Sequence, residues 1–497
     1  MALILVFGLL VVGLVQATAA GRKKRIAAAY NFKPKNVLGG ARFADNRDLR
    51  KAGLFRRVGV FIGFSPDKLH ALYYPGFGHI LTVAAARAGK GATQIVNALL
   101  TCRESCICID PKAENVAITG HRRKRFGEVF VLNPFKILPD ALRGLRMARF
   151  NPMDILDATS DSFHALCDKI AAALVWDEGR EGFHFTTAAR ALVSGVIAAL
   201  VRHGAAAEQN LACVARVISG DIFGFCRVTV RSTTDPFIIQ KLGRFGAAGA
   251  EQSREIMDVI STAITQLAFI GNAAIAESLS GSDFRFRDLK RKRGMTVFIC
   301  LPLHLLDICD KYFRLILETA LADLLSEGQK GKGQRVLAII DEMAQLGPHM
   351  KSLENAMGMA AGAAGLQLWC VLQDLSQLKG MFSTTWETFI QNCGVTCFFG
   401  ARDETTREYV SKLSGISEVI SRSRSVSMQG GSPHVSDGAN QTSRPLLLPF
   451  EVGQLERDEM ITFVENVRCG PVKARRKFYF RVFFGGFRKN PYVKNSR

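Results

Sequence analysis

Short runs of consecutive apolar residues recur along this chain, separated by longer stretches whose apolar residues are three or four positions apart. The runs predict strands buried on both faces, and the spaced stretches predict helices. A parallel sheet covered by helices on both faces requires such strands, so the pattern favours an α/β fold. The predicted strands are Ile80–Ala84, Cys106–Pro111, Glu128–Pro134, Thr296–Pro302, Val336–Glu342, Leu366–Asp374, Val395–Ala401 and Met460–Asn466.

The segment 158–285 differs from the rest of the chain, because its apolar residues recur at helical spacing and no convincing strand-like run interrupts them. We expect an all-α domain here, inserted into the sheet domain and dividing it into residues 26–157 and 286–497. A chain of 497 residues exceeds what one hydrophobic core usually holds, which agrees with two domains. Residues 417–444 are rich in serine, glycine and arginine, and we expect a flexible surface loop there.

Residues 2–20 are almost entirely apolar, and the basic run Arg22–Arg25 follows directly. At about 1.5 Å per residue, such a run forms a helix of roughly 28 Å, close to the thickness of a bilayer core. A cleaved signal peptide is the alternative, but no lysine or arginine precedes the run. We expect residues 1–25 to be a single transmembrane anchor with its basic flank. The positive-inside rule then places the rest of the chain in the cytoplasm.

The composition adds a strong positive charge, with a formal net charge of +21. Such an excess is typical of proteins that meet nucleic acid or anionic lipid, although many basic proteins are merely well solvated. The 12 cysteines are scattered, several of them in apolar runs, as expected of buried thiols in a reducing compartment. Cys102, Cys106 and Cys108 cluster without a second pair at zinc-ligand spacing, so they do not predict a metal site.

Candidate chemistry begins at residues 79–101, where a predicted strand, a small-residue loop and a helix follow one another. Such a loop directs its N–H groups and the helix N-terminus at an anion, and Lys90 adds a mobile positive charge. The match to G-x-x-x-x-G-K-[ST] is imperfect, because Ala84 replaces the first glycine and Gly91 the magnesium-binding hydroxyl. A purely structural strand–helix turn is the alternative. The expected phosphate-binding residues are Ala88, Gly89, Lys90, Gly91 and Ala92.

Two acidic residues end the predicted strand Val336–Glu342, as in the second motif of strand-borne NTPases. Asp341 is expected to hold Mg²⁺, directly or through water, and Glu342 to activate the attacking water. Gln373 ends the next predicted strand, where a polar residue can sense the γ-phosphate, although a glutamine there is usually just a satisfied polar group. We expect Lys90 and the acidic pair to meet at the carboxyl edge of the sheet, brought together by adjacent strands.

With these segments placed, the chain resembles the coupling proteins of type IV secretion and conjugation, the TraG-like group, from about residue 75 to its end. The resemblance rests on short motifs that are modest singly and specific together, because they occur in the family's order. They are Ala88-Gly-Lys-Gly91, Asp110-Pro-Lys-Ala-Glu114, Phe150-Asn-Pro-Met-Asp154, Asp341-Glu-Met-Ala-Gln-Leu-Gly347, Leu372-Gln-Asp-Leu-Ser-Gln-Leu378, Trp386-Glu-Thr-Phe389 and Arg444-Pro-Leu-Leu447.

This resemblance implies a RecA-like P-loop motor domain with an inserted all-α domain and a membrane anchor. It implies a homo-hexameric ATPase at the inner membrane that uses ATP and Mg²⁺. Its cargo would be single-stranded DNA with a relaxase, or effector proteins, passed to the inner-membrane components of the secretion channel. Lys90, Glu342 and Gln373 are then the expected catalytic residues, and Arg402 is the candidate for an arginine that reaches a neighbouring subunit's phosphate. Relatives commonly have two transmembrane helices, whereas one is visible here.

Two other functions are compatible with the sequence. The first is a non-hydrolysing cargo receptor with a decayed nucleotide pocket, which the imperfect loop at Ala84–Gly91 favours and the intact Asp341-Glu342 pair opposes. The second is an FtsK-like DNA translocase. The inserted helical domain counts against it, because such pumps generally keep their accessory parts outside the motor sheet.

Overall fold

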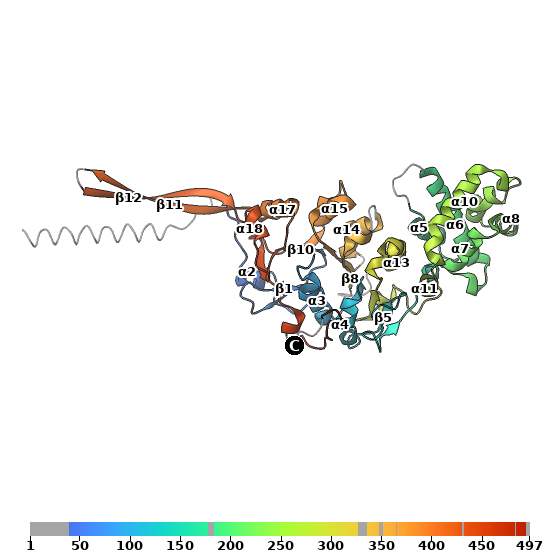
Figure 1. The fold of residues 1–497 in the computed structure, drawn as a ribbon, viewed down its shortest axis with the longest axis horizontal. Coiled ribbons are helices and arrows are strands. Elements are labelled where there is room, and N and C mark those ends of the chain that lie inside the picture. The colour runs from blue at the N-terminus through green and yellow to red at the C-terminus, as the bar shows by residue number, and fades with distance from the viewer. Residues whose placement is uncertain are drawn as a thin grey trace, which may run out of the picture.

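The computed structural model describes residues 39–176, 183–326, 335–346, 351–363, 365–429, 432–482 and 484–493. The predicted anchor at residues 1–25 lies outside these ranges. Figure 1 shows an elongated molecule in which a central sheet with its covering helices lies between a bundle of helices at one end and a long hairpin at the other.

The central sheet has twelve strands in the order β2-β1-β14-β13-β10-β3-β9-β8-β4-β7-β5-β6. All strands from β10 to β6 in this order run parallel, whereas β13, β1 and β2 introduce antiparallel pairs. The predicted α/β fold with a mainly parallel sheet is therefore confirmed. Eight strands were predicted: β3 (His79–Ala84), β4 (Ser105–Ile109), β5 (Val129–Leu132), β7 (Thr296–Ile299), β8 (Val336–Ile340), β9 (Leu366–Leu372), β10 (Cys393–Phe399) and β13 (Glu459–Val464).

Four strands of this sheet were not predicted, because they are short or lie in the mixed lead-in segment. They are β1 (Val60–Phe64), β2 (Ala71–Tyr74), β6 (Arg146–Met147) and β14 (Val472–Arg475). One expectation about the sheet was wrong. β3 and β8 are not adjacent, because β9 lies between them and pairs with both. Strand order depends on long-range pairing, which the local apolar pattern does not contain.

Two hydrophobic clusters cover the two faces of the sheet, because successive side chains of a strand point to opposite faces. In β3, Leu81 and Val83 belong to one cluster, and Ile80 and Ala84 to the other. The helices of this domain are α2 (Asn46–Lys51), α3 (Val96–Thr101), α4 (Glu114–Arg123), α12 (Asp288–Arg291), α13 (Leu306–Ser326), α14 (Lys351–Ala363), α15 (Leu375–Met381), α16 (Trp386–Gln391), α17 (Glu404–Ser414) and α18 (Pro449–Gly453).

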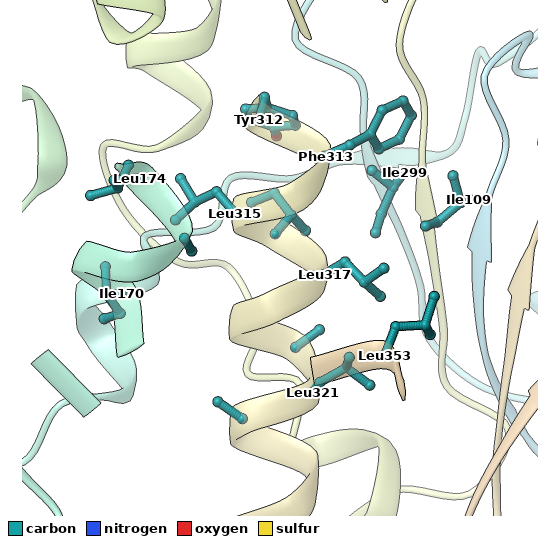
Figure 2. Close-up of a cluster of buried hydrophobic side chains, with 14 of the residues drawn as sticks. Ile109, Ile170, Leu174, Ile299, Tyr312, Phe313, Leu315, Leu317, Leu321 and Leu353 are labelled. Carbon is teal, nitrogen blue, oxygen red and sulfur yellow. The ribbon is translucent and has the colours of Figure 1, made fainter. Parts of the chain in front are cut away.

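Among the described residues between β6 and β7, the chain forms helices and no strand. Helix α13 joins this bundle to the sheet: Figure 2 shows Ile170 and Leu174 of α5 on one side of α13, and Ile109 and Ile299 of the sheet on the other. Both sides of α13 are buried, so the bundle and the sheet share one hydrophobic core. The bundle helices are α5 (Phe163–Leu174), α6 (Phe183–His203), α7 (Leu211–Ser219), α8 (Ile222–Ser232), α9 (Pro236–Gly246), α10 (Arg254–Leu267) and α11 (Ala273–Ser278).

Helix α6 is the one helix of the described ranges that is long and apolar enough to cross a membrane, over His184–His203. Length and apolar composition alone do not distinguish a membrane span from the core helix of a folded domain. Its side chains at Leu192, Val193, Val196 and Ile197 are fully buried within the bundle. The apolar character of α6 is therefore accounted for by packing against its neighbouring helices.

The segment 417–444 corrects a prediction, since it forms strands in place of the expected loop. β11 (Ile416–Gln429) and β12 (Ser432–Pro445) pair antiparallel from Ile416–Pro445 to Gln429–Ser432. Figure 1 shows this hairpin extending away from the central sheet. Main-chain pairing along its whole length specifies the hairpin, and a polar, serine-rich sequence carries no hydrophobic alternation that would have predicted it.

Candidate functional site

The predicted phosphate loop connects β3 to a helix that begins with the π-helical turn η1 (Gly91–Ile95) and continues as α3. Arg87 and Gly89 have φ angles of +63° and +88°, and these left-handed positions turn the chain back toward the helix. Thr93 closes the turn, because its backbone N and its Oγ1 donate to Gly89 O at 2.9 and 2.8 Å. The strand, loop and helix needed to direct N–H groups at an anion are therefore present.

Lys90 lies at the start of this helix and reaches the two acidic residues that follow β8. Its Nζ is 2.7 Å from Glu342 Oε1 and 3.8 Å from Asp341 Oδ1. The three side chains are largely buried, with exposed fractions of 11% for Lys90, 17% for Asp341 and 20% for Glu342. The structure thus brings these three predicted residues together across the intervening strand β9.

Gln373 completes this group from the end of β9, between the other two strands. Its Nε2 donates to Glu342 Oε2 at 3.1 Å. Glu342 has a φ of +57°, a left-handed conformation that is uncommon outside glycine and that clusters at functional sites. One carboxylate of the acidic pair therefore has partners on both oxygens, from Lys90 and from Gln373.

Two buried polar atoms in the group lack a hydrogen-bond partner among the described residues: Lys90 Nζ, despite its ion pair, and Asp341 Oδ1. A phosphate oxygen and a cation are the species that would satisfy an ammonium group and a carboxylate oxygen. The donor set therefore fits a nucleotide phosphate at Lys90 and Mg²⁺ at Asp341.

Burial sets the charges of the acidic residues at this edge. It raises the pKa of Asp341 to about 6, although the charge of Lys90 opposes the rise. Burial also acts to raise the pKa of Glu342, but contact with Lys90 and Gln373 overcomes it and holds that pKa below its ordinary value. Asp110 directly follows β4, the strand beside β8, and burial raises its pKa to about 7 even though Val116 N donates to its Oδ2 at 2.8 Å.

The other predicted phosphate-binding residues line the loop. Ala88 O accepts a hydrogen bond from Arg476, and Ala92 is partly buried against the cluster that contains Val96 and Leu100. A Cβ added at Gly91 would meet no atom within 4 Å. The position of the missing hydroxyl is therefore open space, and nothing steric explains the absence of a serine or threonine.

Arg402 lies three residues beyond the end of β10, the strand that pairs with β3 on the side away from β8. Its side chain is exposed, and its backbone carbonyl accepts a hydrogen bond from Arg407. The loop between β10 and Arg402 lies against the phosphate loop, because a Cβ added at Gly400 would come within 3.1 Å of Ala88 Cβ. Arg402 thus shares the edge of the site without joining the group around Lys90.

Sequence reasoning missed Arg476, which follows β14 and hydrogen-bonds to the phosphate loop. Its side chain donates to Ala88 O at 2.8 Å, to Glu459 O at 3.3 Å and to Arg457 O. Its guanidinium also lies 3.8 Å from the centre of the Phe399 ring. Burial lowers its pKa to about 10, so it is charged at neutral pH.

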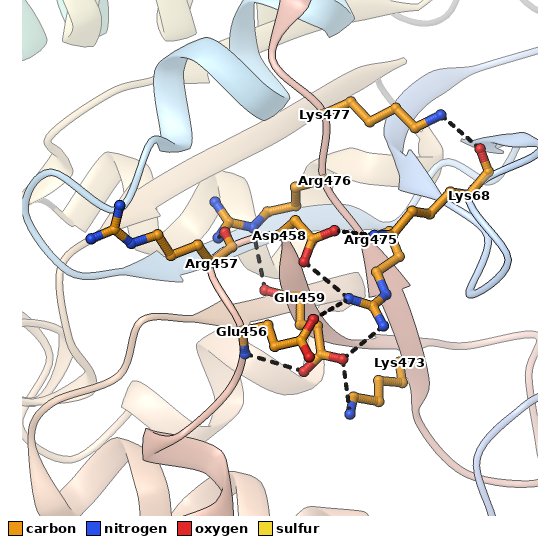
Figure 3. Close-up of polar contacts among 9 residues, drawn as sticks. All are labelled: Lys68, Glu456, Arg457, Asp458, Glu459, Lys473, Arg475, Arg476 and Lys477. Atoms are coloured by element: carbon orange, nitrogen blue, oxygen red, sulfur yellow. Dashed lines mark hydrogen bonds and ion pairs between the residues drawn. The ribbon is translucent and has the colours of Figure 1, made fainter. Parts of the chain in front are cut away.

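Nothing in the local sequence distinguishes Arg476 from its neighbour Arg475. Figure 3 shows the difference: Arg475 turns toward the carboxylates of Glu456, Asp458 and Glu459, and Arg476 turns away from them. The one available signal was the alternation of faces along a strand, which a four-residue strand is too short to reveal.

The fold and the site together define a class of protein. A mainly parallel sheet carries a lysine-bearing phosphate loop after one strand and an acidic pair after another, at the same carboxyl edge. This is the arrangement of phosphate-loop nucleotide-binding proteins.

The chain belongs to the family described as "Type IV secretory system Conjugative DNA transfer", whose model matches residues 19–497. It is 27% identical over 473 residues to Protein VirD4 of Agrobacterium fabrum (strain C58 / ATCC 33970), covering 90% of this chain and 67% of that protein. It is 25% identical over 456 residues to the conjugal transfer protein TraG of Escherichia coli, covering 83% and 70%. The predicted family, the coupling proteins of type IV secretion, is confirmed.

Solved structures show the same fold. The plasmid coupling protein TrwB in complex with the non-hydrolysable ATP analogue ADPNP has a TM-score of 0.65 at 16% identity, covering 89% of this chain and 96% of that one. TrwB in complex with ADP and Mg²⁺ has a TM-score of 0.63 at 15% identity, covering 89% and 95%. The chain spans about two thirds of the length of the VirD4 relatives that it matches.

Proposed function

We propose that this chain is the ATP-hydrolysing coupling protein of a type IV secretion or conjugation system. The observation that carries the proposal is the approach of Lys90 to Asp341 and Glu342 at the carboxyl edge of the sheet, with unsatisfied polar atoms facing one another. Membership of the conjugative DNA transfer family supports the cellular role, and the TrwB complexes with ADPNP and with ADP and Mg²⁺ support ATP and Mg²⁺ as ligands.

The ion pair between Lys90 and Glu342 suggests how binding prepares the site. In the free protein Lys90 neutralises Glu342, which is the expected base. An incoming triphosphate competes for the ammonium group, so Lys90 turns to the β- and γ-phosphates and releases the carboxylate. Glu342 then loses a stabilising cation, its proton affinity rises, and it becomes a better acceptor for a proton of the attacking water.

The remaining residues have supporting roles. The N–H groups of Gly89 to Ala92 bind the phosphates, and Asp341 holds Mg²⁺, which when bound neutralises charge developing on the phosphates. Without a hydroxyl at residue 91, Asp341 would hold the ion, with water in place of the missing side-chain ligand. Gln373 donates a hydrogen bond to Glu342 and follows β9, the strand between β3 and β8. Its position therefore suits a residue that responds to loss of the γ-phosphate. Arg402 is proposed to act on a neighbouring subunit's nucleotide.

The cellular context is proposed on the same basis. Residues 1–25 would anchor the chain by a single pass in the inner membrane, with residues 26–157 and 286–497 forming the RecA-like motor and 158–285 its inserted all-α domain. Six copies would enclose a pore for single-stranded DNA bound to a relaxase, or for effector proteins. The net charge of +21 suits a path for phosphate-rich cargo, and DNA binding should weaken steeply with salt.

A receptor that binds cargo without hydrolysis is the second candidate, and Gly91 is the residue that favours it, because it removes a usual Mg²⁺ ligand. DNA-stimulated ATP turnover by the fragment from Gly21 onward separates the two. Lys90→Ala is expected to abolish nucleotide binding and turnover. Glu342→Gln is expected to keep binding and to lose turnover by about 100-fold or more.

Two variants serve as matched controls, Lys412→Ala and Glu404→Gln, since both residues are exposed on α17. Both controls should turn over ATP at the wild-type rate, and every variant should attach to membranes when expressed with residues 1–25. Normal turnover by both Lys90→Ala and Glu342→Gln contradicts the motor assignment. Absence of turnover in the wild-type fragment, with nucleotide binding intact, favours the receptor.

A further inference from the structure

We propose that Phe478 and Phe480 form a stacking surface for the purine base of the nucleotide whose phosphates lie on the loop at Lys90. This inference rests on the proposed function, because it concerns the other end of the same ligand. The two residues are called the aromatic shelf below.

The topology places the shelf on the correct side of the phosphate loop. β14 runs parallel to β3, because it pairs antiparallel with β13, which pairs antiparallel with β10. The chain therefore leaves β14 at the same carboxyl edge that carries the phosphate loop. In the sheet, β14 and β8 lie on opposite sides of β3. A triphosphate whose γ end faces Asp341 and Glu342 after β8 extends its base toward the β14 side.

The shelf is held to the phosphate loop by two hydrogen bonds and a buried ring. Arg476 donates to Ala88 O at 2.8 Å, and Asn97 Nδ2, from the helix after the loop, donates to Lys477 O at 2.9 Å. Tyr479 lies between the two shelf residues and is buried against Val96 and Leu100 of that helix. The segment that carries the shelf is therefore fixed to the phosphate loop and its helix on both sides of Phe478.

The shelf rings themselves are exposed, with accessible fractions of 40% for Phe478 and 53% for Phe480. They stack nearly parallel, with centroids 5.2 Å apart and an interplanar angle of 12°. Phe478 Cε1 lies 3.8 Å from the place where a Cβ at Gly89 would be. Phe478 at contact distance from the phosphate loop, with Phe480 stacked on it, offers the flat apolar face on which nucleic-acid bases stack.

Stacking alone predicts how selective the site is. Every base has a π-face, and a purine offers more of it than a pyrimidine. The shelf contributes no hydrogen-bonding group, because both of its side chains are phenylalanines. We therefore expect ATP and GTP to bind with similar affinity, and CTP and UTP more weakly.

The test compares ATP with inorganic tripolyphosphate, which has the phosphates and lacks the base. Dissociation constants are measured for both ligands on the full chain in detergent, with and without the double change Phe478→Leu and Phe480→Leu. Leucine keeps an apolar side chain at each position and removes the π-face. We expect the variant to lose about tenfold or more in affinity for ATP and to bind tripolyphosphate as the wild type does.

Two further variants make the result specific. Phe478→Tyr with Phe480→Tyr should restore ATP affinity, because tyrosine stacks as phenylalanine does. Phe450→Leu changes an exposed phenylalanine of α18, outside the shelf, and should change neither constant. A wild-type protein that binds neither ligand refutes the proposed function itself. If the shelf variant keeps its full ATP affinity, or loses instead subunit assembly or DNA binding, the shelf inference is wrong while the proposed function stands.

Discussion

Replacing Arg476 by methionine is the perturbation whose consequences follow most directly from the contacts of the phosphate loop. Methionine fills a similar volume and removes every donor of the guanidinium. Three backbone carbonyls, of Ala88, Arg457 and Glu459, then lose a hydrogen bond inside the protein. The Phe399 ring loses its cation as well.

The size of the effect follows from these losses. Each hydrogen bond is worth about 1 kcal/mol net, and a desolvated cation–π contact about 1–2 kcal/mol. Relief from burying the guanidinium offsets part of this total, since burial lowers its pKa to about 10. A net loss of about 3 kcal/mol remains, in line with removal of one partner from a buried polar network. In a domain of about 340 residues, whose unfolding entropy is about 0.7 kcal/mol/K, that loss lowers Tm by about 4 °C.

Calorimetry and nucleotide titration together test this account. We expect Arg476→Met to lower Tm and to weaken ATP binding about fivefold, because reordering an unsupported loop at a cost of about 1 kcal/mol reduces affinity by that factor. Arg475→Met is the matched control, since Arg475 pairs with the carboxylates of Glu456, Asp458 and Glu459 and, among the described residues, makes no contact with the phosphate loop. It should leave ATP affinity unchanged. Wild-type Tm and affinity in Arg476→Met would show that the loop does not depend on this arginine.

Two further predictions concern the metal ligand and the pH dependence. Gly91→Ser is expected to fold normally, because a Cβ there meets no atom within 4 Å; it should lower the Mg²⁺ concentration for half-maximal turnover several-fold, and an unchanged Mg²⁺ titration would mean that residue 91 does not face the ion. Asp110 has a pKa of about 7 in the folded protein against 3.8 unfolded, so its contribution to stability is complete below pH 3.8 and is lost as pH rises through 7. Tm should therefore fall between about pH 4 and pH 7, and the fall should be smaller in Asp110→Asn; an equal fall in both proteins would place the titrating group elsewhere.

The parts of this molecule that sequence reasoning predicted are those with local signals. Runs of apolar residues predicted β3, β4 and β8, because a strand buried on both faces can be recognised from its own residues alone. Lys90 and the acidic pair were found in the same way, since each lies in a short motif directly after a strand. Two features that depend on pairing between distant residues were not predicted. They are the position of β9 between β3 and β8, and the pairing of the hairpin at 416–445.

Arg476 and the aromatic shelf illustrate the same limit at the site. Both lie in a basic and aromatic segment whose residues look equivalent in the sequence. Their different contacts depend on the pairing of β14 with β13. In that position Arg476 donates a hydrogen bond to Ala88 O, and Phe478 lies beside Gly89. Tyr479, between the exposed rings, packs into the core. The segment thus contains one ring that packs into the core and two that stay exposed, and its composition alone does not distinguish them.

The distance from Lys90 Nζ to Glu342 Oε1 in a structure of the chain with ADPNP and Mg²⁺ tests the central claim most directly. It is 2.7 Å in the free protein. We predict that it lengthens beyond ion-pair contact as Lys90 turns to the phosphates, with Asp341 facing the metal. A nucleotide bound elsewhere, with the Lys90–Glu342 pair intact, would contradict the account.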